Sequence, residues 1–182
     1  NCYERGKPYP QEIVQFPVVV YEPQYDFIDK KGAFNSYCNP DLPLNPFCTH
    51  LTGITLAQTD VAPRFPEVFK AFEKWRAEKG YTRENSILVT CGDWDLKFCL
   101  PQQMKYSELK IPSYFKQWIN IKQSFKKAYG KRGTGMAGML RKLGLPLEGR
   151  HHNGFDDAYN TAKIVQALAR EGQYLEETSR LA

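Results

Sequence analysis

The sequence predicts one α/β domain, because strand patterns come first and are then mixed with amphipathic helices. Residues 12–21 (EIVQFPVVVY) are rich in β-branched side chains, which is typical of a buried strand. Residues 86–91 (SILVTC) form a continuous apolar run, which indicates a central strand buried on both faces. Residues 155–170 place small apolar side chains on one helical face. The 182 residues, 42% of them hydrophobic, are enough to bury one core.

Shorter patterns complete the predicted domain. Residues 34–38 are expected to pair with the first strand as a hairpin. Pro17 indicates an edge or a bulge in that strand, because proline has no amide hydrogen to donate. The other expected elements are a helix over 66–79 that Gly80 ends, a short strand over 118–121, a basic helix to Tyr129, and an amphipathic helix over 136–143.

The distribution of charge favours a polyanionic partner. Net charge is only +5, but the chain between Glu108 and Glu148 carries nine basic residues and no acidic one. Such a local positive field attracts nucleic acid, although a solvated helix face is the alternative explanation. Aromatic residues between the basic ones favour nucleic acid further, though some of them must belong to the core: Tyr114, Phe115, Trp118, Phe125 and Tyr129.

Other sequence features exclude some classes of protein. No apolar run approaches the roughly 20 residues needed to span a bilayer, and no signal segment argues for secretion. The five cysteines are widely spaced and form no Cys-x-x-Cys pair. This spacing favours reduced thiols in a cytoplasmic or nuclear protein.

The first candidate catalytic residue is Asp95, which lies just past the predicted strand over 86–91. Open α/β sheets place ligands and catalytic groups at the carboxyl ends of their strands. The alternative is a helix cap, because Asp93 or Asp95 could begin the next helix. The sequence alone favours neither interpretation.

The second candidate cluster is residues 151–157 (HHNGFDD), at a junction between a loop and a helix. A histidine five residues before an acid offers a base next to a possible metal ligand. The alternative again is capping, with Asp156 as the cap of the following helix. Two acids and two histidines exceed what one cap requires, which favours a functional role.

Together these groups indicate metal-assisted hydrolysis of a phosphodiester. Mg²⁺ prefers hard oxygen ligands, few of them from protein and the others from water and phosphate. Two carboxylates from different elements, a histidine and a basic surface suit that chemistry. Two acids are too few for two ions, so the spacing alone predicts no more.

Several motifs, in order along nearly the whole chain, resemble the ERI-like branch of the DEDDh 3′→5′ exonucleases. They are Pro10-Gln11-Glu12-Ile13 with Phe16-Pro17, Phe47-Cys48 with Leu51-Thr52-Gly53-Ile54, Trp94-Asp95, Trp118-Ile119-Asn120, and Gly149-Arg150 with His152, Gly154, Asp156-Asp157 and Asn160. The resemblance implies a ribonuclease H-like exonuclease fold, with a mixed central sheet flanked by helices. It also implies a single exonuclease domain over residues 1–182.

The resemblance implies a role for each matching residue. Asp95 and Asp157 would be metal ligands for two divalent cations, Mg²⁺ or Mn²⁺, and His152 would deprotonate the attacking water. The terminal base and sugar of a single-stranded 3′ end, most consistent with RNA and possibly DNA, would contact Phe47, Leu51 and Trp94 and the backbone of Thr52 and Gly53. The residues expected to contact RNA electrostatically are Lys122, Lys126, Lys127, Lys131 and Arg132.

The resemblance places one motif outside this sequence. The family's Asp-x-Glu pair would lie on a strand preceding Asn1, so the domain is expected to start just after that strand. The leading expectation is a two-metal 3′→5′ exoribonuclease with a histidine base. The alternative is a relative of the same fold that binds nucleic acid, or acts as a scaffold, without cutting.

Overall fold

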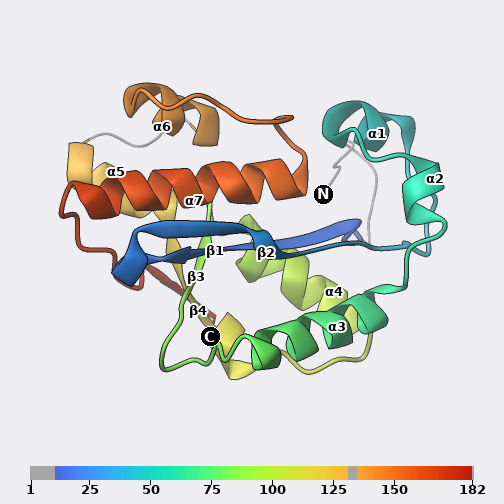
Figure 1. Cartoon of the computed structure of the whole chain (residues 1–182). Coiled ribbons are helices and arrows are strands. Elements are labelled where there is room, and N and C mark those ends of the chain that lie inside the picture. The colour runs from blue at the N-terminus through green and yellow to red at the C-terminus, as the bar shows by residue number, and fades with distance from the viewer. Residues whose placement is uncertain (1–10, 131–134, 182) are drawn as a thin grey trace.

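The computed structural model describes residues 11–130 and 135–181, which form two small sheets and the helices around them (Figure 1). Strands β1 (Gln15–Glu22) and β2 (Phe27–Tyr37) pair in antiparallel fashion and are joined by a 3-10 turn, Pro23–Tyr25. Strand β3 (Leu88–Thr90) is parallel to β4 (Gln117–Asn120), and β4 is antiparallel to β5 (Ser179–Arg180). The helices and the mixed strand directions confirm the predicted α/β class.

Helices cover the strands from two sides. Helix α7 (Gly154–Arg170) packs on β1 and β2, and α3 (Phe65–Glu78) packs on β2 from the other side in Figure 1. A π-helical turn, Asp95–Cys99, continues into α4. The other helical elements are α1 (Pro46–Thr52), α2 (Leu56–Thr59), α4 (Leu100–Tyr106), the 3-10 turn Ser113–Phe115, α5 (Ile121–Tyr129) and α6 (Met136–Lys142).

Two large apolar clusters hold these layers together. In the first, the rings of Phe16 and Phe34 from the hairpin pack edge-on against Phe72 of α3, at centroid distances of 5.2 and 5.5 Å. In the second, α5 and α6 pack on α7 through residues such as Phe125, Met139 and Ile164. The end of β3, which leads to Asp95, is thereby fixed against α7, which carries Asp157.

The first predicted strand and its pairing with a hairpin partner are confirmed, although β2 begins at Phe27 and not at residue 34 as predicted. The register shifts between Val18 and Val20, close to Pro17. The expectation for residues 86–91 is partly wrong. Only Leu88–Thr90 form the strand, and they are half-buried, with Ile87 exposed. Among the described residues β3 pairs only with β4, which accounts for this exposure. Instead β4 supplies the buried strand, with Trp118 fully enclosed.

No helix within residues 11–130 and 135–181 is both long and apolar enough to cross a membrane.

Cys38 and Cys91 are free thiols, and burial raises the pKa of Cys38 to about 12 and that of Cys91 to about 11. Cys48 takes part in a disulfide. The expectation that every cysteine is reduced is therefore wrong for Cys48.

Candidate active site

The end of β3 is tied to the neighbouring strands by Asp93. Its Oδ1 atom accepts hydrogen bonds from Nε1 of Trp118 (3.0 Å) and from Oγ of Ser179 (2.6 Å). These bonds hold the pKa of the Asp93 carboxyl below its usual range, against an opposing effect of burial. Asp93 thus acts as a link between β3, β4 and β5, and it makes no helix-capping bond.

Asp95 lies two residues further on, at the start of the π-helical turn. Its side chain is open to solvent, yet the protein around it is dense enough that desolvation raises the pKa of its carboxyl. No side-chain cap begins this turn, so the capping interpretation of Asp95 is also wrong. A desolvated carboxylate at a strand end is suited to a cation.

The loop before α7 shows which residue caps that helix. Oδ1 of Asn153 accepts from the backbone amides of Phe155 (3.2 Å) and Asp156 (3.5 Å), so Asn153 is the cap and the prediction for Asp156 is wrong. Asp156 instead accepts from the amide of Arg150 at 2.7 Å. It fills the space above Gly149, where a Cβ atom would lie 2.2 Å from the Asp156 carboxyl carbon.

His152 and Asp157 lie directly against each other. The backbone amide of His152 donates to both carboxylate oxygens of Asp157, at 3.2 Å each. His152 adopts a left-handed conformation (φ 71°), which is uncommon for a residue with a Cβ atom, and such conformations cluster at functional sites. Burial raises the pKa of Asp157, and both His151 and His152 remain exposed.

Both acids lie near the end of β3. Both carboxylates add to burial in raising the pKa of the Cys91 thiol, which places Asp95 and Asp157 within electrostatic range of one point. The closer group of ligand atoms, all within 4.8 Å of one another, consists of His151, His152 and Asp157 and does not include Asp95. Two desolvated carboxylates from different elements are a donor set that fits a hard divalent cation.

The predicted nucleotide-contacting residues divide into two kinds. Phe47 and Trp94 have exposed rings (46% and 51%), and Leu51 is half-buried, so all three are accessible to a base or sugar. Thr52 is turned inward: its hydroxyl donates to the Cys48 carbonyl at 2.8 Å and accepts from the Ile54 amide. The amide of Gly53 donates to the Thr49 carbonyl.

Two backbone carbonyl oxygens at the end of α1 accept hydrogen bonds from the loop that contains His151 and His152. Leu51 accepts from Nε of Arg150 at 3.4 Å, and Thr52 accepts from Nδ2 of Asn153 at 3.4 Å. Each carbonyl keeps a second lone pair for a ligand hydroxyl.

For two residues near the candidate site, Arg150 and Phe98, no role was predicted from the sequence. Arg150 also donates to the His50 carbonyl and lies so close to Gly53 that a Cβ atom there would be 2.9 Å from the Arg150 side chain. Phe98, one helical turn after Trp94, is 51% exposed, and the centroids of the two rings are 5.2 Å apart. The spacing of four residues was the only sequence signal for this pair.

The predicted basic contacts also differ among themselves. Lys122 is half-buried and lies over the backbone of Gly92, near Asp95. Lys126 is exposed on α5, and Lys127 forms an ion pair with Glu176 at 2.5 Å. Lys131 and Arg132 lie outside the described residues.

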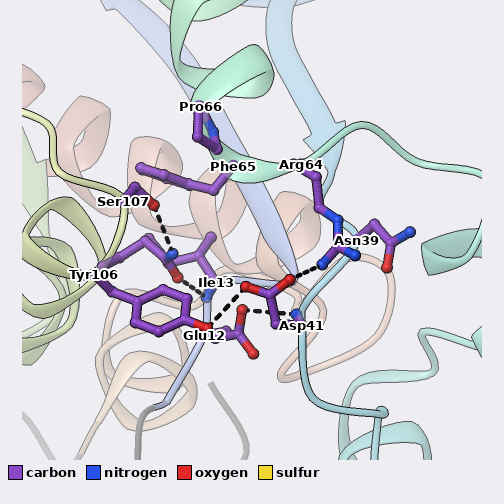
Figure 2. Close-up of a pocket in the computed structure, with 10 residues that line it drawn as sticks. Glu12, Ile13, Asn39, Asp41, Arg64, Phe65, Pro66, Tyr106 and Ser107 are labelled. Atoms are coloured by element: carbon purple, nitrogen blue, oxygen red, sulfur yellow. Dashed lines mark hydrogen bonds and ion pairs between the residues drawn. The ribbon is translucent and has the colours of Figure 1, made fainter.

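A pocket of about 300 Å³ lies away from these residues, between the start of β1, the loop after β2 and the ends of α3 and α4 (Figure 2). Its polar groups satisfy one another. Glu12 accepts from the amides of Asp41 and Leu42, and Asp41 accepts from Tyr106 and pairs with Arg64. This network fixes the loop that leads to α1, and none of the predicted site residues lines the pocket.

Carboxylates at a strand end of an α/β domain, with a histidine beside an acid at a helix start, can hold a divalent cation next to a basic group. The RNase_T family model, described as "Exonuclease", matches residues 6–165. The chain therefore belongs to this family, and the predicted resemblance is confirmed.

Several of the matching relatives are named exoribonucleases. "ERI1 exoribonuclease 3" of Homo sapiens and of Bos taurus is 40% identical over 94% of this chain and 52% of the relative, and "3'-5' exoribonuclease 1" of Rattus norvegicus is 36% identical over 98% of this chain and 53% of the relative. This chain spans about half the length of these relatives.

Solved structures agree with the predicted fold. The nuclease domain of 3'hExo, a DEDDh family member bound to rAMP, superposes with a TM-score of 0.92 at 35% identity, covering 98% of this chain and 92% of that one. A 3'-exonuclease described with 3'-end specific recognition of the histone mRNA stem-loop gives a TM-score of 0.92 at 34% identity, over 98% and 82%. The predicted ribonuclease H-like fold is thereby confirmed.

Proposed function

We propose that this protein is a metal-dependent 3′→5′ exonuclease that hydrolyses phosphodiester bonds at single-stranded 3′ ends, with RNA as its main substrate. The observation that carries the proposal is the contact between His152 and Asp157 near the strand end that holds Asp95. A protein that only binds RNA has no need for a histidine held against one acid with a second acid near the same strand end.

In this proposal each side chain has one task. Asp95 and Asp157 would hold Mg²⁺ or Mn²⁺, two ions in the complete site, and bound divalent metal would supply charge for the developing phosphorane and lower the pKa of water. His152 takes the proton of the attacking water, because an imidazole nitrogen can accept a proton as a general base. Its exposed ring can be reached by water and by a phosphate.

The end of the RNA would lie between α1 and the Trp94 ring. Apolar contact with Phe47 and Leu51 and stacking on Trp94 tolerate every base, as an enzyme that removes successive nucleotides requires. The carbonyls of Leu51 and Thr52 are acceptors for the terminal 2′- and 3′-hydroxyls. Lys122 and Lys126 would attract the phosphate backbone towards the site.

The proposal is tested with a 5′-labelled single-stranded RNA and a circular RNA of the same sequence, each incubated with Mg²⁺ or Mn²⁺ and with a chelator. We expect the linear RNA to shorten from its 3′ end, the circle to persist, and the chelator to stop cleavage. Linear RNA that stays intact but shifts on a gel would overturn the proposal in favour of a non-cutting binder.

Variants connect the activity to the named residues. Asp157→Asn keeps an acceptor for the His152 amide but removes the ligand charge, so cleavage should be lost while RNA binding persists. His152→Asn should lower the rate by about 10²–10⁴-fold, the usual contribution of a general base. Asp60→Asn, at the exposed end of α2, is the matched control and should cleave normally. Cleavage by Asp157→Asn at the rate of the unchanged protein would refute the metal assignment.

A further inference from the structure

His151 is the one histidine next to the candidate base, and the proposed reaction has no use for it. Adjacent side chains in an extended chain point in opposite directions. Here the left-handed conformation of His152 turns the chain, so that the rings of His151 and His152 lie on the same side, with centroids 4.0 Å apart and planes within 13° of parallel. Two exposed imidazoles therefore lie beside one carboxylate.

These three side chains offer ligand atoms of a distinct chemical kind. One atom each of His151, His152 and Asp157 lies within 4.8 Å of the other two. Imidazole nitrogen suits Zn²⁺ and its neighbours among the transition metals, whereas Mg²⁺ prefers oxygen ligands alone. Two histidines and one carboxylate with an open fourth position make up a common zinc ligand set.

We propose that His151, His152 and Asp157 form a binding site for Zn²⁺ or a similar transition metal ion, and that its occupation inhibits the nuclease. The inhibition, though not the site, rests on the proposed function. A metal bound to His152 occupies the lone pair that would accept the proton of water. The same ion engages Asp157, so the base and one Mg²⁺ ligand are withdrawn together.

The geometry requires a small rearrangement. Zn–N and Zn–O bonds of about 2.0–2.2 Å place tetrahedral ligand atoms about 3.3 Å apart, closer than the present limit of 4.8 Å. Stacked rings also direct their in-plane lone pairs in parallel, so one ring must turn out of the stack. Both histidines are exposed on a turn, where side-chain rotation is readily available.

The binding part of the proposal is tested with Zn²⁺ alone, by competition against a chromogenic chelator at pH 7.5. We expect the unchanged protein to bind, and His151→Asn to lose about tenfold or more in affinity, since even second-shell changes cost metal sites 10–100-fold. His50→Asn removes an exposed histidine from α1 and is the matched control, expected to bind as the unchanged protein does. Equal Zn²⁺ affinity in all three proteins would overturn the site.

A second experiment measures the coordination geometry of the bound metal and does not depend on RNA cleavage. Co²⁺ in the site should give the strong visible absorption of tetrahedral coordination, and His151→Asn should lose it. Unchanged spectra in that variant would overturn the assignment of His151.

The inhibitory part is tested by RNA cleavage at a fixed excess of Mg²⁺ with rising Zn²⁺. His151→Asn should keep the basal rate and need about tenfold more Zn²⁺ for half-inhibition, matching its loss of affinity. Identical inhibition curves would overturn the regulatory role. If the protein bound Zn²⁺ but cleaved no RNA under any condition, the proposed function would fail while the metal site stood.

Discussion

Arg150 connects the two halves of the candidate site, because its Nε atom donates to the Leu51 carbonyl at 3.4 Å across 99 residues of sequence. Its guanidinium also donates to the His50 carbonyl, and Asn153 donates to Thr52 beside it. These carbonyls lie at the end of α1, and His152 lies two residues after Arg150 in the loop. The segment expected to hold the terminal nucleotide is therefore fixed relative to His152, the proposed base that would deprotonate the attacking water.

Replacing Arg150 by alanine should impair cleavage by loosening this connection. A displacement of about 1 Å between bound substrate and catalytic groups can cost about 10²-fold in rate, so we expect kcat/KM to fall by about 10- to 100-fold. Single-turnover cleavage of a short RNA measures this. Binding of long RNA, which depends on many phosphate contacts, should change little.

Arg141→Ala is the matched control. Arg141 is exposed on α6, and this substitution removes the same positive charge as Arg150→Ala. Equal losses of kcat/KM in the two variants would show that Arg150 acts only through charge.

Asp93 should make the stability of the protein depend on acid pH. Its folded-state pKa is lowered, because hydrogen bonds from Ser179 and Trp118 outweigh the opposing effect of burial. The stability it contributes is present above the unfolded-state pKa near 3.9 and is lost as the pH falls through the lower folded-state value. Asp93→Asn should thus lower the midpoint of urea unfolding at pH 7 but much less at pH 2–3.

A hydrogen bond to a charged group contributes about 1.5–3 kcal/mol to the free energy of unfolding. We expect a smaller loss of stability in Asp93→Asn, because Asp93 is only half-buried. Asp60→Asn, exposed at the end of α2, should leave the curve unchanged at both pH values. A deficit in Asp93→Asn that is equally large at both pH values would mean that packing, and not charge, is what Asp93 contributes.

Trp94 and Phe98 should act together on the RNA end. Both rings are half-exposed and their centroids are 5.2 Å apart, so Phe98 supports the Trp94 face. Base stacking on an aromatic side chain contributes about 1–3 kcal/mol, which predicts a loss of about 5- to 150-fold in affinity for a 3′-terminal oligonucleotide in Trp94→Ala. Phe98→Ala should lose less, and the double variant little more than Trp94→Ala alone.

Fluorescence anisotropy with a short RNA and with a circular RNA measures both losses. Tyr174→Ala, a highly exposed ring near the C-terminal end, serves as the control and should bind normally. Equal losses on the linear and the circular RNA would contradict a role at the 3′ end.

Elements that are defined by a local sequence pattern could be predicted, whereas elements held by contacts with distant segments could not. Helices α3, α6 and α7 were predicted within one or two residues, because their apolar periodicity is local. The short helix α1 and strand β5 carry too few residues for a pattern. Both are held by contacts with distant segments, such as Arg150 on α1 and Asp93 on Ser179.

In the candidate site, too, local motifs could be predicted from the sequence and long-range contacts could not. The spacing of His152 and Asp157 in one motif predicted that both belong to one site, and the structure brings them into contact. The alternative for this motif, with Asp156 as the cap of the following helix, was excluded only by the structure, in which Asn153 is the cap. The contacts of Arg150 with α1 were not predicted, because they join segments about 100 residues apart. For Phe98 the only sequence signal was its spacing of four residues from Trp94.

Lys126 and Lys127 should contribute differently to RNA binding although they are neighbours on α5. Lys127 is paired with Glu176 at 2.5 Å, so that pair carries no net charge, whereas Lys126 is exposed. Each phosphate contact on a single strand adds about 0.7 to the slope of log K against log salt. Lys126→Gln should therefore lower the slope by about that amount, and Lys127→Gln by clearly less. Glu176→Gln should raise the slope, because it frees Lys127 for phosphate. If both lysine variants lower the slope equally, the ion pair does not withdraw Lys127 from RNA. If neither does, α5 is a solvated face that contacts no phosphate.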